Sequence, residues 1–270
     1  MNFISTKAQI NKLKSVMKRA AITSGKHLIK AYRRKKVNFT EKSKKEWVTE
    51  TDLAVEKIII KELIKDYPNS NFMAEESGTN IKDPEQITWI IDPIDGTNNF
   101  ITKYPYFCIS IAGYSEGEII SGCILNPLND ELFLAVKGQG AYLNHKKYKV
   151  SDETKFSSLI YGTGFVISNP ASVKRNMKNL NAIIYNIKSF RRTGSAALDL
   201  ANASCGRQHG YWQLLARPWD YAAGVILVRE AGGIVTDVKG NDLTLKSKSI
   251  LFSITPILLK VFKSNFSFDV

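Results

Sequence analysis

The chain has 270 residues, 44% of them hydrophobic, which is enough to bury a substantial core as one large domain or two smaller ones. Three scattered cysteines and three scattered histidines exclude a disulfide framework and show no spacing typical of a zinc or histidine-based metal site. No apolar run reaches the ~20 residues of a membrane span, and the N-terminus lacks the apolar stretch of a signal peptide, so we expect a cytoplasmic protein without membrane contact.

The net charge of +13 is concentrated at the N-terminus. Residues 1–45 contain 14 Lys and Arg but one acid, whereas the remaining chain carries 24 basic and 24 acidic residues. This charge fits either a surface for nucleic acid or another acidic partner, or a solvated helix face. The solvated face is favoured, because no aromatic stacking platform or recognised nucleic-acid motif accompanies the charge.

Helical spacing of apolar and small residues predicts an amphipathic helix over residues 7–33, and the lysine-rich stretch 42–46 predicts an exposed loop. A second helical pattern starts near Asp52 and ends before Pro68. At that position Asp52 is suited to capping the helix or to complementing its dipole. Residues 71–74 predict a short strand that leads into Glu75 and Glu76, an acidic pair of a kind that is most often a solvated turn.

The stretch Trp89–Phe100 gathers acidic groups and free backbone N–H groups at one strand end. Three apolar residues predict the end of a buried strand, and Asp92 and Asp95 follow around a proline. Gly96 then permits a tight turn into a helix. Carboxylates suit Mg²⁺ and a helix N-terminus suits phosphate, although an ordinary strand–turn–helix joint explains the same residues equally well.

The rest of the chain alternates strands and helices. Period-two segments at residues 107–113, 118–125 and 131–136 predict antiparallel hairpins that bury Cys108 and Cys123 as small core residues. A connector at 149–155 leads to a second half. There we expect strands near 159–165, 187–190, 210–214, 234–238 and 249–253, and helices starting at 168–170, after Gly194, at Asp220 and at 256–262.

Four motifs in order resemble the inositol monophosphatase family: Trp47–Asp52, Ala74–Ser77, Trp89–Phe100 and Trp219–Gly224. The pair Arg217-Pro218 resembles its bacterial branch. The resemblance implies an α/β fold, a layered αβαβα sandwich of the inositol monophosphatase and fructose-1,6-bisphosphatase type. It further implies one catalytic domain over residues 1–270, with halves at about 1–150 and about 151–270 that share a cleft, and a homodimer.

The resemblance implies a hydrolase of small phosphomonoesters that uses two or three Mg²⁺ ions and is inhibited by lithium. A lysine at the spacing of Lys42 lies near the metal site in this family. The implied roles are metal ligation by Glu75, Asp92, the Ile94 carbonyl, Asp95 and Asp220; catalysis by Glu75, Thr97 and Asp52; and substrate contact by Asp95, Gly96, Thr97, Gly194, Ser195, Ala196, Gln213 and Asp220.

Two positions depart from the family pattern and leave the substrate open. Gln213 stands where inositol monophosphatases usually have Glu, and His209 stands where an acid is common. We expect inositol-1-phosphate, with fructose-1,6-bisphosphate, histidinol phosphate and 3′-phosphoadenosine 5′-phosphate as alternatives. A different class of function, a nucleic-acid-associated regulatory protein acting through the basic N-terminal helix, is the further alternative.

Overall fold

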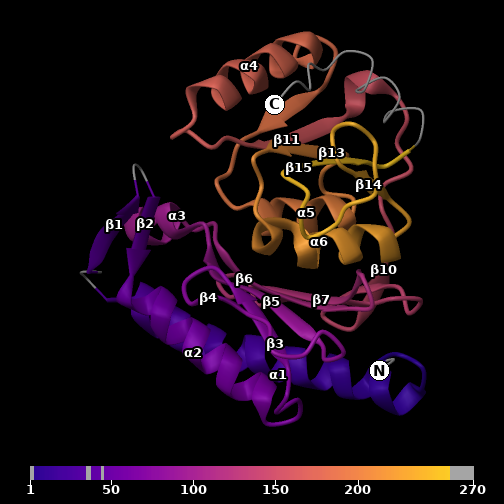
Figure 1. Cartoon of the computed structure of the whole chain (residues 1–270). Helices are drawn as coiled ribbons and strands as arrows, with labels where there is room; N and C mark the ends of the chain where they lie inside the picture. The colour runs from indigo at the N-terminus through magenta and orange to yellow at the C-terminus, as the bar shows by residue number, and fades with distance from the viewer. Residues whose placement is uncertain (1–2, 35–37, 44–45, 256–270) are drawn as a thin grey trace.

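Two helices, α1 (Lys7–Tyr32) and α2 (Glu50–Ile64), form the first of five layers (Figure 1). The computed structural model describes residues 3–34, 38–43 and 46–255. Next come an eight-stranded sheet, the helices α5 (Ala196–Ser204) and α6 (Pro218–Glu230), a five-stranded sheet, and finally α4 (Pro170–Ile183). The predicted αβαβα sandwich is confirmed.

Local sequence explains how both helices of the first layer begin. Each starts with a capping box, in which a threonine side chain and the residue three positions later satisfy each other's backbone N–H groups; the pairs are Thr6 with Gln9 and Thr49 with Asp52. Arg19 joins the helices, because its guanidinium reaches Glu62 Oε2 at 2.9 Å and Asp66 Oδ2 at 2.5 Å.

The eight-stranded sheet has the order β10-β9-β8-β7-β6-β5-β3-β4. Only the β3–β5 pair in it is parallel among the residues described. The predicted hairpin strands are confirmed to within two residues at each end, whereas β4, β9 and β10 are too short to show a period and were not predicted. The strands are β3 (Asn71–Ala74), β4 (Gly78–Asn80), β5 (Thr88–Asp95), β6 (Cys108–Ser115), β7 (Glu118–Asn126), β8 (Glu131–Val136), β9 (Ala141–Leu143) and β10 (Lys146–Tyr148).

The loop predicted at residues 42–46 is wrong at both ends, because residues 42–43 and residue 46 belong to strands, while residues 44–45 lie outside the described residues. Strands β1 (Phe39–Ser43) and β2 (Glu46–Thr49) form a separate antiparallel hairpin, and Lys42 lies within β1. The alternation of polar residues with Phe39 and Trp47 allows this pairing, in which the two rings contact each other edge to face. The hairpin stands above the start of α2 (Figure 1).

The five-stranded sheet has the order β12-β11-β13-β15-β14, and β11, β12 and β13 run parallel. All five strands were predicted, with β12 displaced by one to two residues. Their bounds are β11 (Ile160–Gly164), β12 (Ser189–Arg191), β13 (Gly210–Leu214), β14 (Ile234–Thr236) and β15 (Ser249–Ser253). The short helices are α3 (Thr97–Thr102) and η1 (Phe156–Ser158). The helix predicted at 256–262 lies outside the described residues.

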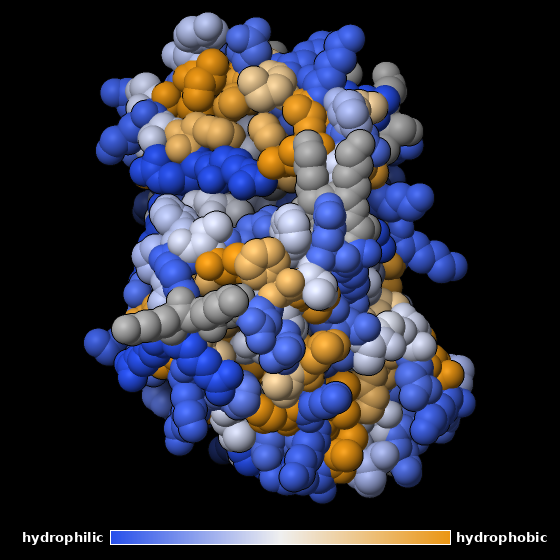
Figure 2. Space-filling view, turned by 90° about the vertical axis from the view of Figure 1, so that its left-hand side faces the viewer, coloured by the Kyte–Doolittle hydropathy of each residue, from blue (hydrophilic) through white to orange (hydrophobic). Residues whose placement is uncertain are grey.

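Two apolar clusters hold the layers together. One packs α1 and α2 against the first sheet, and the other surrounds α5 and α6 between the two sheets. Gly224 lets these two helices approach closely, because a Cβ there would lie 2.5 Å from Leu200 Cβ. On the face that Figure 2 shows, hydrophilic residues are interspersed with hydrophobic patches. Among the described helices, none is both long and apolar enough to cross a membrane.

His209 generates a pH prediction. Its Nδ1 accepts a hydrogen bond from Ile160 N at 3.0 Å, and its backbone N–H donates to Ile160 O at 2.8 Å, which fixes the joint between β11 and β13. Burial lowers the pKa of His209. The unfolded chain therefore binds more protons, and stability is lost as pH falls through the unfolded histidine pKa of ~6.5.

In His209→Asn the side-chain oxygen can still accept from Ile160 but does not titrate. The measurement is the free energy of unfolding in urea at about pH 7.5 and about pH 5.5, on either side of that pKa. Between these two pH values, the wild type should lose more unfolding free energy than the variant. The other histidines are common to both proteins and cancel. Equal losses would contradict the assignment.

Candidate active site

A β-bulge in β5 brings two carboxylates to the same side of the first sheet. Asp92 pairs with Ser110 and Asp95 with Cys108, so β5 has one residue more than β6 over this interval. Residues three apart on a regular strand face opposite sides, and the extra residue corrects this. Pro93 is tolerated here because a bulge does not need its missing N–H. The strand therefore continues to Asp95 instead of ending at the predicted turn.

Asp95 binds the start of α5, although the two segments are 100 residues apart. Its Oδ2 accepts hydrogen bonds from Ser195 Oγ at 2.6 Å and from Ala197 N at 2.7 Å. A carboxylate at a helix N-terminus satisfies free N–H groups and complements the helix dipole. Gly194, which adopts φ +93°, allows the turn before this helix to pass Asn99, whose side chain donates to Thr193 O.

Glu75 follows β3, and the parallel pairing with β5 places it beside the acidic end of that strand. Ala74 pairs with Ile91, and Glu75 N donates to Ile91 O at 3.1 Å. Lys42 from the β1–β2 hairpin donates from Nζ to Glu75 O at 3.0 Å. The lysine that the resemblance places near the metal site therefore contacts the main chain of a predicted ligand.

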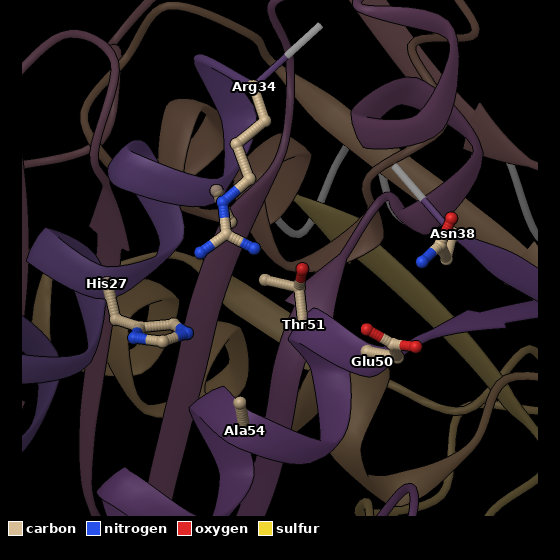
Figure 3. Close-up of a pocket in the computed structure, with 7 residues that line it drawn as sticks. His27, Arg34, Asn38, Glu50, Thr51 and Ala54 are labelled. Carbon is tan, nitrogen blue, oxygen red and sulfur yellow. The ribbon is translucent and has the colours of Figure 1, made fainter. Parts of the chain in front are cut away.

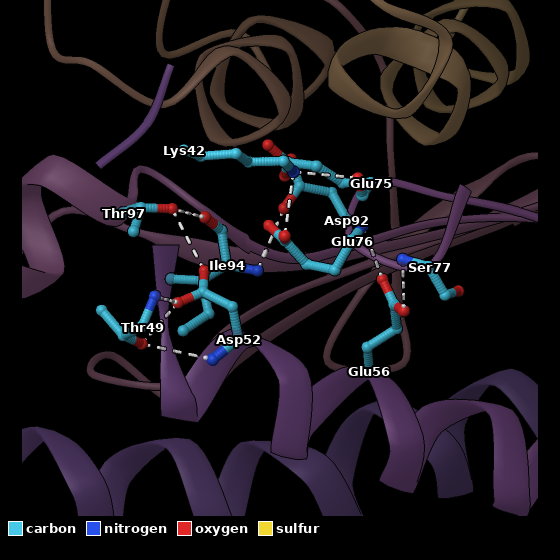
Figure 4. Close-up of polar contacts among 10 residues, drawn as sticks. All are labelled: Lys42, Thr49, Asp52, Glu56, Glu75, Glu76, Ser77, Asp92, Ile94 and Thr97. Carbon is cyan, nitrogen blue, oxygen red and sulfur yellow. Dashed lines mark hydrogen bonds and ion pairs between the residues drawn. The ribbon is translucent and has the colours of Figure 1, made fainter. Parts of the chain in front are cut away.

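Asp52 joins the start of α2 to Thr97 (Figure 4). Its Oδ2 accepts from Thr49 N at 2.8 Å and from the Thr49 hydroxyl, as a capping residue does. Its Oδ1 lies 3.2 Å from Thr97 Oγ1, which also lies 3.0 Å from Ile94 O. The capping role and the site role predicted for Asp52 are thus compatible, because each uses a different oxygen.

Asp220 occupies the first turn of α6. Its Oδ2 accepts a hydrogen bond from Arg217 N at 2.7 Å, which satisfies the N-cap position of that helix. The capping role that sequence alone suggests is therefore present. Asp220 also lines the same cleft as Glu75 and Asp95, and its charge raises the pKa of Glu75 and that of Asp92.

A cleft of about 1010 Å³ opens where these elements meet. Three predicted residues, Asp52, Asp92 and Ile94, do not line it; they lie buried behind its wall with exposures of 0%, 2% and 1%. His209 does not line the cleft either, so its departure from the family pattern is structural. The predicted residues that line the cleft are Glu75, Asp95, Gly96, Thr97, Gly194, Ser195, Ala196, Gln213 and Asp220.

The electrostatics of the carboxylates favour a bound cation. Burial raises the pKa of Asp52 to about 6, and burial together with the charge of Asp220 raises the pKa of Glu75 to about 8. The pKa of Asp92 lies well above its ordinary value because the group is buried next to Glu75. A hard cation would relieve this repulsion, and carboxylate and carbonyl oxygens are the donors that Mg²⁺ prefers. The residues present therefore fit Mg²⁺.

The exact ligand set stays a prediction. Within the described ranges, no three His, Cys, Asp or Glu side chains are arranged to hold one ion. One oxygen of Asp95 and one of Asp220 are bonded instead to N–H or O–H donors of the protein.

Gln213 lines the cleft, as expected. It belongs to β13, which is an interior strand of the five-stranded sheet. It is 7% exposed, and its Oε1 accepts a hydrogen bond from Tyr211 OH at 2.5 Å. On the neighbouring strand Gly164 leaves room for it, because a Cβ there would lie 2.1 Å from Gln213 Oε1. The amide is therefore oriented by Tyr211 on β13 and accommodated by Gly164 on β11.

Two buried carboxylates next to these residues were not predicted. Asp199 lines the cleft and accepts hydrogen bonds from Tyr106 OH at 2.8 Å and Thr193 Oγ1 at 2.6 Å, and burial raises its pKa to about 6. Glu56, on α2, binds the turn after β3 (Figure 4). Asp199 lies four residues after Ser195, the N-cap of its helix, and Glu56 lies four residues after Asp52 on α2; both of the earlier residues were predicted site residues. That spacing is the one signal that sequence offered.

A second, smaller hollow of about 190 Å³ lies between α1 and the start of α2 (Figure 3). Its polar lining includes His27, Arg34, Glu50 and Thr51. None of the predicted site residues is among the described residues that line it. The site predicted from sequence therefore corresponds to the large cleft.

Similar proteins align with most of the chain. The chain is 37% identical over 229 residues to a "Nus factor SuhB" of Xylella fastidiosa, which covers 84% of this chain and 82% of that protein. It is 39% identical over 223 residues to the "Nus factor SuhB" of Escherichia coli K12, which covers 82% and 84% respectively.

Among solved structures, the extragenic suppressor protein suhB from Bartonella henselae matches with a TM-score of 0.90 and 34% identity, over 96% of this chain and 100% of that one. The inositol monophosphatase from Anabaena matches with a TM-score of 0.85 and 33% identity, over 96% and 97%. A model of the inositol monophosphatase family matches residues 9–265. The chain belongs to the inositol monophosphatase family.

Proposed function

We propose that this chain is a Mg²⁺-dependent phosphomonoesterase that hydrolyses inositol-1-phosphate to inositol and phosphate. Family membership implies a phosphomonoesterase. The observation that carries the proposal is the meeting of Glu75, Asp95 and Asp220, from three distant segments, on one cleft that also contains Thr97. We further expect the family's lithium sensitivity, a homodimer and a cytoplasmic location.

The proposed metal-binding groups are Glu75, Asp92, the Ile94 carbonyl, Asp95 and Asp220. When bound there, Mg²⁺ supplies positive charge that polarises the phosphate and lowers the pKa of a water molecule.

The chain's own residues position the reactants. Glu75 and Thr97 orient the attacking water, and Asp52 holds the Thr97 hydroxyl through the contact at 3.2 Å. The backbone N–H groups of Gly96 and Thr97 hold the phosphate.

The second sheet and the helices beneath it supply the substrate contacts. Gly194, Ser195 and Ala196 bring backbone and small side chains close to the alcohol, and Gln213 faces its hydroxyl groups. Asp95 and Asp220 lie between these contacts and the proposed metal site. In this division of roles, residues in the second half of the chain determine which alcohol group the substrate can carry.

The purified protein should hydrolyse inositol-1-phosphate with Mg²⁺ and lose activity in excess chelator. In Asp95→Asn the amide oxygen can still accept from Ser195 and Ala197, so the fold is kept while one charge is lost. Turnover should fall by on the order of 10²-fold, since each ~1.4 kcal/mol of lost transition-state stabilisation is tenfold. The matched control is Asp242→Asn, on a side chain that is 97% exposed.

Full activity in chelator or in Asp95→Asn would refute the metal-dependent chemistry. The same assay with fructose-1,6-bisphosphate, histidinol phosphate and 3′-phosphoadenosine 5′-phosphate tests the substrate. A higher kcat/KM for one of these would replace inositol-1-phosphate and leave the chemistry intact.

Gln213→Glu should improve discrimination in favour of inositol-1-phosphate over glycerol-2-phosphate. Tyr211 OH can donate to either side chain, but a carboxylate accepts hydroxyl hydrogen bonds about twice as strongly as an amide. The expected gain is about 0.5–1.5 kcal/mol, a few-fold in the ratio of kcat/KM values. The control is Gln139→Glu, in the turn between β8 and β9. An unchanged ratio would show that Gln213 does not touch the ring.

A second candidate function is a nucleic-acid-associated regulatory role through α1. Relatives named Nus factor SuhB prompt it. Part of the N-terminal charge is engaged within the protein, since Arg19 bonds Glu62 and Lys12 lies over the Tyr67 ring. Near the end of α1, however, Lys26, Lys30 and Arg33 are exposed and make no ion pair with any described residue. Lys35 and Lys36 lie outside the described residues.

If this region binds RNA or DNA, affinity should fall steeply with salt, because cationic contacts release counterions. Reversal of Lys26, Lys30 and Arg33 to Glu should abolish binding in anisotropy titrations at two salt concentrations. Reversal of Lys174, Arg175 and Lys178 on α4, in the opposite outer layer, is the matched control. The absence of binding at low salt, or equal effects of both triple variants, would leave α1 as a solvated face.

A further inference from the structure

The turn that carries Glu75 has backbone groups that the sheet does not satisfy. Ala74 and Gly78 are the last paired residues of the β3–β4 hairpin, so residues 75–77 form its turn. Glu75 N donates to Ile91 O. The next two N–H groups, of Glu76 and Ser77, point away from the sheet toward α2 (Figure 4).

Glu56 accepts both of these N–H groups. Its Oε2 lies 3.0 Å from Glu76 N and its Oε1 lies 3.0 Å from Ser77 N, so one carboxylate fixes two consecutive peptide planes. Glu56 is 3% exposed, and it lies one helical turn after Asp52 on the same face of α2. Charge-assisted hydrogen bonds of this kind are among the strong ones in proteins.

Lys42 holds the same turn from the other side. Its Nζ donates to Glu75 O at 3.0 Å and to Glu76 Oε2 at 2.8 Å, and the Glu76 side chain is only 4% exposed. The main chain on both sides of the Glu75 Cα is therefore fixed, by Ile91 before it and by Lys42 and Glu56 after it. The direction in which the Glu75 side chain leaves the main chain follows from these bonds, since the carboxylate itself makes no hydrogen bond to a described residue.

We propose that Glu56 is a positioning residue for the metal site, which acts by aiming the Glu75 carboxylate through the turn 75–77. This inference rests on the proposed role of Glu75 as a metal ligand. It assigns to α2 two separate supports of the site: Asp52 holds Thr97, and Glu56 holds Glu75. Groups that orient metal ligands typically contribute 10–100-fold in metal affinity or activity.

Glu56→Gln tests the proposal. The amide oxygen of Gln can still accept a hydrogen bond from one of the two N–H groups. The amide nitrogen is itself a donor and cannot accept from the other N–H group, so one of the two hydrogen bonds to the turn is lost. The matched control is Glu62→Gln, which makes the same change on the same helix at a residue that is 8% exposed and bonds Arg19 and Lys65. Both proteins are compared with the wild type by Mn²⁺ titration calorimetry and by thermal unfolding without metal.

We expect Glu56→Gln to raise the Kd for Mn²⁺ and the Mg²⁺ concentration for half-maximal hydrolysis by about 10–100-fold. At saturating Mg²⁺, kcat should recover most of the wild-type value. Glu62→Gln should leave both metal readouts unchanged even where its unfolding temperature falls. If Glu56→Gln lowers the unfolding temperature without changing the Mn²⁺ affinity, Glu56 only stabilises the turn and the proposal is overturned.

Glu56→Asp gives the same test if the first variant does not fold, because it keeps the charge but is too short to reach both N–H groups. Failure of both variants to fold would make Glu56 a folding residue and would also overturn the proposal. The wild-type titration separates this inference from the proposed function. A wild type that binds no Mn²⁺ refutes the metal site itself, whereas equal affinities of wild type and Glu56→Gln refute only the role of Glu56.

Discussion

The bond between Asp95 and the start of α5 is the interaction on which the cleft depends. It joins the last residue of β5, in the first sheet, to the helix layer that packs beneath the second sheet. The carboxylate would be costly to bury alone, and the Ser195 hydroxyl and the Ala197 N–H offset that cost. Because α5 and α6 lie in the apolar cluster between the sheets, this contact sets the position of Gly194, Ser195 and Asp220 relative to the acidic strand end.

Three of the acids that we propose serve the site also stabilise the starts of helices. Asp52, Asp95 and Asp220 each accept backbone N–H groups at the first turn of a helix, α2, α5 and α6 respectively. A carboxylate held in this way is already oriented before any cation arrives, so little conformational freedom is lost on binding. This arrangement also explains why Asp52 and Asp220, taken alone in the sequence, are indistinguishable from ordinary caps, whereas the contact of Asp95 with α5 leaves no trace in the local sequence.

Local patterns predicted most strands and helices, and the resemblance of four short motifs to a known family implied the layers and most of the residues that line the cleft. The apolar periods of β5, β6 and β7 and the four motifs are contained in short stretches. The bulge at Pro93 was not predictable, since it exists only relative to the partner strand β6. Glu56 and Asp199 were missed for a related reason: a single acid on a helix is normally exposed, and only the tertiary packing buries these two. The role of His209 was left open, because a position in the chain does not reveal whether a side chain faces the cleft or supports the sheet behind it.

The separation of the cleft into two walls has an evolutionary consequence. The acids that favour a cation come mostly from the first sheet and α2, whereas the β11–β13 strand ends and the start of α5 form the opposite wall. The hydrogen bonds of Asp52, Glu75 and Asp95 involve neither Gln213 nor Tyr211, so either residue can be exchanged without disturbing them, whereas Ser195 in the same wall is constrained by its bond to Asp95. Under the proposed function, the β11–β13 part of the second wall is therefore free to drift toward new alcohols, while the start of α5 and Asp220 stay constrained together with the acids of the first half.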